Sequence, residues 1–69
     1  MFKISTVGLI QLSHQARAKA LETKDVTLQT ALTNAADTVM SAASILLRYE
    51  EGEVPLDVAK AVNFIHEHL

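Results

Sequence analysis

Apolar side chains recur between residues 28 and 49 at intervals that alternate between four and three. They are Leu28, Leu32, Ala35, Val39, Ala42, Leu46 and Tyr49. This 3.5-residue repeat is typical of a helix that packs lengthwise against other helices. A second apolar row beside it widens the apolar arc to more than half of the helix circumference. That row consists of Ala36, Met40, Ala43 and Leu47. One neighbour cannot cover so wide an arc, so we expect this helix to be central and to contact at least two others.

Turn-forming residues divide the rest of the chain, and three helices are predicted at about 6–23, 27–51 and 55–69. Asp25 and Thr27 are both good N-caps for the second helix. Gly52 suits the position after its end, and Pro55 suits the first turn of the third helix. In residues 1–5 apolar and polar residues alternate, which indicates an extended arm.

The first and third predicted helices differ in their apolar pattern. The third has a single stripe that contains Val58, Val62 and Ile65, which we assign with the 28–49 row to a helix-packing and dimer seam. The first is apolar on two opposite sides. One side holds Leu9, Leu12, Ala16 and Ala20, and the other holds Val7, Ile10, Ala18 and Leu21 together with His14. Since both sides must be covered, we expect a homodimer and assign the first of these rows as possible partner-binding residues.

The second predicted helix also has a short-chained polar face and an alanine flank. Alanines allow helix axes to approach closely and make larger substitutions unfavourable by overpacking. The polar face consists of Thr30, Thr33, Asn34, Asp37, Ser41, Ser44 and Arg48, and is either a solvated face or a lightly hydrated docking surface. Ile45 lies off the apolar seam.

Composition limits the class of protein. The 69 residues allow one domain, and a core this small usually needs a disulfide, a metal or a second subunit for stability. Cysteine is absent, which favours dimerisation and a reducing compartment such as the cytoplasm. The net charge of −2 makes nucleic acid an unlikely partner, and the apolar runs are too short to span a membrane.

Candidate chemistry is sparse, so we expect neither an enzyme nor a cofactor. On a helix, His66 and His68 point about 160° apart and cannot bind one metal ion, so no metal site is predicted. His14 is interpreted as a boundary residue or a pH-sensitive contact. Glu50, Glu51 and Glu53 form an acidic cluster, which is either a solvated loop or a possible docking point for a basic partner.

One stretch suggests a different class of function. Residues 41–62, "SAASILLRYEEGEVPLDVAKAV", resemble the recognition-helix end of Cro-type repressors, which are helix-turn-helix DNA-binding regulators. The resemblance implies that Ser41, Ser44 and Arg48 face DNA and that Ile45 is buried. Val39 stands where the turn of such a motif carries glycine.

The sequence therefore predicts an all-α, antiparallel three-helix bundle with a long alanine-rich central helix, completed by dimerisation. The expected role is a small regulatory, adaptor or inhibitor protein that binds a larger protein through helical surfaces. The helix-turn-helix regulator is the alternative.

Overall fold

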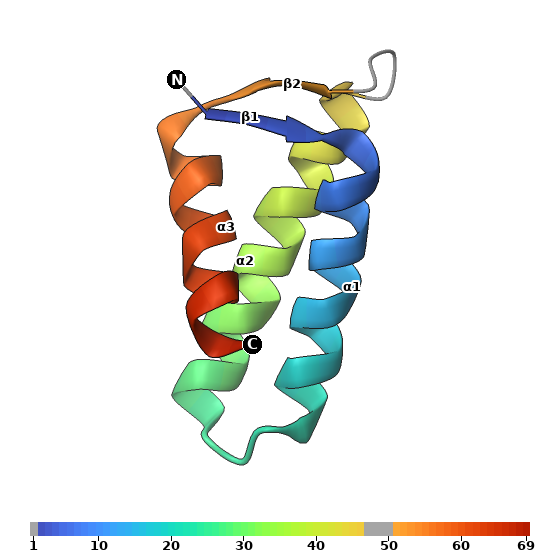
Figure 1. Cartoon of the computed structure of the whole chain (residues 1–69). Helices are drawn as coiled ribbons and strands as arrows, with labels where there is room; N and C mark the ends of the chain where they lie inside the picture. The colour runs from blue at the N-terminus through green and yellow to red at the C-terminus, as the bar shows by residue number, and fades with distance from the viewer. Residues whose placement is uncertain (1, 47–50) are drawn as a thin grey trace.

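The computed structural model describes residues 2–46 and 51–69, which form three packed helices and a two-stranded antiparallel sheet. In chain order the elements are β1 (Phe2–Ser5), α1 (Thr6–Glu22), α2 (Val26–Ile45), β2 (Glu51–Val54) and α3 (Leu56–His68). From β1 the chain runs away from the sheet along α1 and back along α2. After β2 it runs away from the sheet again along α3 (Figure 1). The molecule measures 36 × 18 × 16 Å. The prediction of a mostly helical protein built from three packed helices is confirmed.

Side chains at the helix starts satisfy backbone amides that have no partner within the helix. The Gly8 amide donates to Ser5 Oγ at 2.9 Å, which caps α1. Asp25 Oδ1 accepts from the amides of Thr27 and Leu28 at 3.0 and 3.3 Å. Of the two N-caps considered for the second helix, the structure therefore uses Asp25, and α2 begins at Val26.

The end of α2 corrects the prediction. This helix stops at Ile45 rather than at residue 51, and Gly52 lies inside β2, opposite Ile4 of β1, instead of following a helix. Pairing with β1 gives the backbone of Glu51–Val54 hydrogen-bond partners that a continued helix would have supplied locally. Those partners belong to β1, which is far from β2 in the sequence. Helical periodicity therefore gives no indication of them.

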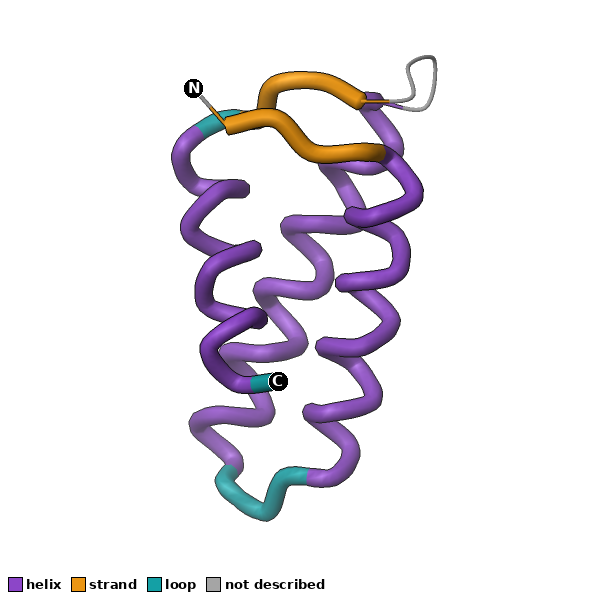
Figure 2. The backbone as a smooth tube through the Cα atoms, in the orientation of Figure 1, coloured by secondary structure: helices purple, strands orange, loops and turns teal. Residues whose placement is uncertain are grey.

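The same pairing gives the predicted extended arm a defined structure. Both strands cross the end of the molecule where α1 and α3 begin and α2 ends (Figure 2). Ile4 and Val54, one from each strand, are half-buried and pack against the hydrophobic core. The Thr6 hydroxyl donates to the Leu46 carbonyl at 3.1 Å, which joins the start of α1 to the end of α2.

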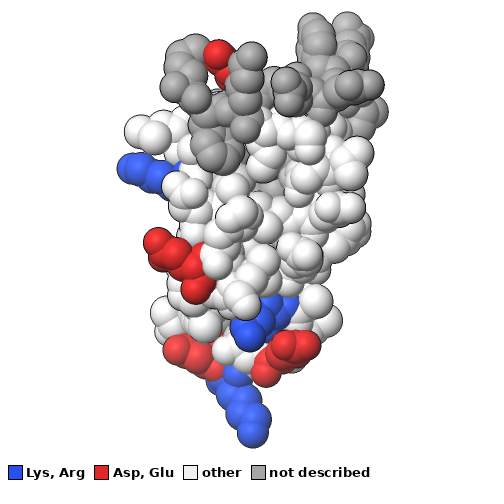
Figure 3. All heavy atoms as spheres, viewed as in Figure 1, with Lys and Arg blue, Asp and Glu red and all other residues white. Residues whose placement is uncertain are grey.

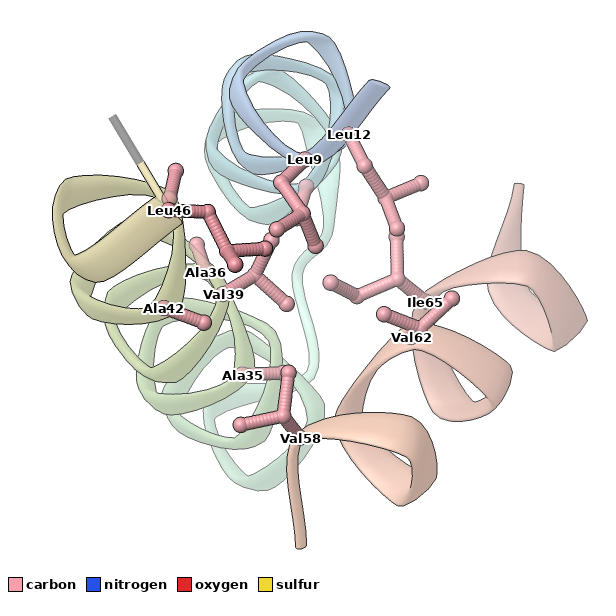
Figure 4. Close-up of a cluster of buried hydrophobic side chains, with 12 residues drawn as sticks. Leu9, Leu12, Ala35, Ala36, Val39, Ala42, Leu46, Val58, Val62 and Ile65 are labelled. Carbon is pink, nitrogen blue, oxygen red and sulfur yellow. The ribbon is translucent and has the colours of Figure 1, made fainter. Parts of the chain in front are cut away.

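The core lies between the three helices, and α2 contacts both of the others, as the width of its apolar arc predicted. Side chains from all three helices point into one interior (Figure 4). Four alanines of α2 are among the buried residues: Ala35, Ala36, Ala42 and Ala43. Their burial agrees with their expected place between helices, and the close helix approach that small side chains allow stays a prediction.

Most of the predicted seam is buried within a single chain. The buried members are Leu32, Ala35, Val39, Ala42, Leu46, Val58, Val62 and Ile65. Leu28 is half-buried, and Tyr49 lies outside the described residues. Among the described residues, no helix combines the length and apolar character that crossing a membrane requires.

Candidate functional site

The apolar row of α1 that was expected to contact a partner lies instead in the protein's own core. Leu9, Leu12, Ala16 and Ala20 are all 4% exposed or less. They face α2 and the rest of the interior, so a partner cannot reach them while the fold is intact. The opposite row is the accessible one, with Val7 63% exposed and Leu21 84% exposed.

The three acidic residues expected to attract a basic partner have different positions. Glu50 lies outside the described residues, and Glu51 is in β2, where its backbone is paired with that of Ser5. Glu53 also belongs to β2, and its side chain is exposed. Of the three, Glu53 is the residue that the structure places at a recognisable surface feature.

That feature is a groove of about 370 Å³ between the C-terminal half of α2 and the junction of β2 with α3. Its lining residues are Thr38, Ser41, Ala42, Ile45, Leu46, Glu53, Val54, Pro55, Asp57 and Val58. Pro55, in extended conformation, ends β2 and precedes α3, so the chain turns there and forms the wall opposite α2. The groove depends on the early end of α2, because a helix continuing to residue 51 would leave no β2 wall.

Ile45 is the most unusual residue of this groove. It is 79% exposed, although it is a large β-branched apolar side chain in the last turn of α2. Val54 is half-buried and Pro55 is exposed on the facing wall, so the groove has an apolar surface on both sides. Transferring such surface from water to a partner is favourable by about 25 cal/mol per Å² of apolar area.

Two carboxylates border the same groove. Glu53 lies at the β2 side, and Asp57 lies in the first turn of α3, where the positive end of the helix dipole stabilises it. Both side chains are exposed. Within residues 2–46 and 51–69, the ion pair that the structure records joins Arg17 of α1 to Asp37 of α2, away from the groove. The groove is therefore apolar on its walls and acidic at its edge.

The side chains with catalytic or metal-binding potential do not converge. Among the described residues, no three His, Cys, Asp or Glu side chains gather at a distance suited to a metal ion. His68 places Nδ1 2.8 Å from the Phe64 carbonyl and packs its ring against that of Phe64, whereas His66 and His14 are exposed. The groove lining includes the hydroxyls of Thr38 and Ser41 but no imidazole that would activate them. The side chains that line the groove suit contact with another molecule.

The segment that resembles a helix-turn-helix has a different structure here. α2 is one helix from Val26 to Ile45 and passes through Val39 without a turn. Ile45, which the resemblance requires to be buried, is exposed. Arg48 lies outside the described residues.

The sequence contains one signal for the groove, which is the position of Ile45 off the seam, beside the short polar side chains of α2. Ser41 lies one turn before it and Thr38 two turns before it, and both also line the groove. The opposite wall, formed by Val54 and Pro55, carries no such signal, because their position beside α2 follows from strand pairing.

No protein-family model, curated protein or solved structure matches the chain.

Proposed function

We propose that this protein is a small, non-enzymatic protein-interaction module that binds a larger protein and acts as a regulator, adaptor or inhibitor. The observation that carries the proposal is the groove at Ile45, where apolar walls are exposed at the surface of a chain whose core is already filled. A large aliphatic side chain that is mostly exposed beside a concave apolar surface is a feature of protein contact sites.

The filled core supports this interpretation. One apolar row of each helix is buried against the other helices, and Ile45 lies outside the core that these rows form. The absence of a turn at Val39 gives the DNA-binding alternative no support from this segment. Dimerisation stays a prediction, and mass determination in solution tests it. With Leu9 and Leu12 buried, the α1 row that contains Val7 and Leu21 is the one open to a second copy.

The proposal is tested by affinity capture from cells that make the protein, with quantitative mass spectrometry. Three baits are compared: the natural chain, Ile45→Ser, and Val26→Ser as a matched control, since Val26 is also β-branched, is 71% exposed and lies at the opposite end of α2. We expect a protein that the natural chain and Val26→Ser enrich equally and that Ile45→Ser enriches about tenfold less, which corresponds to about 1.4 kcal/mol.

Two results contradict the proposal. If no protein is enriched over an unrelated bait of similar size, the role as an interaction module is wrong. If a partner is captured equally by all three baits, the binding surface is elsewhere. Circular dichroism and thermal melting of each variant confirm that the fold is retained.

A further inference from the structure

The chemistry of the groove narrows the kind of partner, provided that the proposed binding function holds. Its walls offer apolar contact through Ile45, Val54 and Pro55, and its edge carries Glu53 and Asp57. Among the described residues that line the groove, none is lysine or arginine. A ligand that fits therefore combines apolar side chains with positive charge.

The dimensions suit a few inserted side chains rather than a whole helix. The groove volume of about 370 Å³ is at the lower end of the range for ligand pockets, which is about 300–1,000 Å³. It is open along one side of α2, so an amphipathic helix lying across it can insert its apolar side chains while its backbone stays outside. This is the helix-in-groove mode of recognition, with anchors spaced by three and four residues.

The negative charge at the groove favours a foreign partner over a second copy of this chain. A symmetric dimer through the groove would place the same patch of both subunits face to face. Glu53 and Asp57 would then approach their own copies, and the described part of the lining has no lysine or arginine to separate the four carboxylates. Like charges placed opposite each other disfavour an interface, whereas a cationic partner is attracted.

We propose that the groove binds a basic amphipathic helix of a partner protein. Apolar side chains of that helix pack between Ile45 on α2 and Val54 on β2. Lysine or arginine side chains on its flanks pair with Glu53 and Asp57. These pairs stay near the surface, so they contribute more to selectivity and association rate than to total affinity.

The test uses a fluorescently labelled designed peptide of leucine and lysine with helical periodicity, about 18 residues or ~27 Å long. A second peptide replaces every lysine with glutamate. Binding is measured by fluorescence anisotropy at low and high salt. We expect the natural chain to bind the leucine–lysine peptide at least about tenfold more tightly than the leucine–glutamate peptide, with a preference that decreases as salt rises.

Charge-reversal variants locate the effect. The pair Glu53→Lys with Asp57→Lys is expected to weaken binding of the leucine–lysine peptide by about tenfold or more. Its control, Glu22→Lys with Glu67→Lys, changes the net charge equally at exposed residues outside the groove lining and is expected to change binding by less than about threefold. Because Asp57 lies in the first turn of α3, Glu53→Lys by itself is measured as well, in case the double variant unfolds.

The outcomes separate this inference from the broader proposal. If both double variants weaken binding equally, or if both peptides bind equally well, the inference of a basic partner is overturned. The interaction module still holds in that case if Ile45→Ser abolishes capture of the cellular partner. If neither peptide binds, the inference is also overturned, and the capture experiment decides independently whether the protein is an interaction module.

Discussion

Ser13 of α1 places a hydroxyl group in the hydrophobic interior of the protein. Its side chain is fully buried, and its Oγ has no hydrogen-bond partner among the described residues. Burying a hydroxyl without a partner is unfavourable relative to its hydrated state in the unfolded chain. A small apolar side chain would fill much the same space without this cost, so Ser13 lowers the stability of the fold.

We therefore predict that Ser13→Ala increases the free energy of unfolding by about 1–2 kcal/mol. Part of any Ser→Ala gain in a helix comes from higher helix propensity, so Ser41→Ala on the exposed side of α2 is the control. Urea unfolding followed by circular dichroism measures both changes. An equal gain in the two variants would mean that the Ser13 hydroxyl carries no burial penalty.

At the scale of the elements, α2 organises the fold because its alanines are placed where the helices meet. Ala36 and Ala43 are 0% and 1% exposed, so a larger side chain there would have to be accommodated inside the core. Both residues belong to the second apolar row, beside the heptad-like row. The sequence pattern already contained these two most deeply buried alanines of α2, although periodicity does not rank them above Ala35 and Ala42.

Ala36→Leu is predicted to lower the free energy of unfolding by about 1–3 kcal/mol, because the added atoms force the packed helices apart. Ala18→Leu, on the exposed side of α1, adds the same atoms at the surface and is expected to change stability by no more than about 0.5 kcal/mol. Thermal or urea unfolding compares the two. If Ala36→Leu is as stable as the natural chain, the contact at Ala36 is not tightly packed.

At the scale of the whole molecule, tertiary contacts stabilise the strands less than the helices. The sheet has two strands of four residues each, and an isolated sheet of this size is marginal in water. It is held in place by the packing of Ile4 and Val54 on the core and by the covalent connection of β1 to α1. The helices, in contrast, bury continuous apolar stripes against one another.

Native-state hydrogen exchange is therefore expected to show unequal protection. Amides in the middle of α2, around Val39, should exchange only through global unfolding, whereas amides of β1 and β2 should exchange through smaller openings and faster. Mass spectrometry or NMR measures the two sets in one experiment. Strand amides that exchange as slowly as those of α2 would show that the sheet unfolds together with the helices, and that the groove wall is as stable as the core.

What the sequence by itself determined is the set of helices, the central position of α2 and the identity of most core residues. These follow from local physics: periodicity of 3.5 residues places Leu32, Val39 and Leu46 on one side, and capping residues such as Asp25 mark the starts. The tertiary structure alone decided where α2 ends, which face of α1 is buried and where the groove lies. Those features depend on pairing between β1 and β2 and on the choice between two similarly apolar faces of α1. Both are settled by contacts between distant parts of the chain, which no local pattern records.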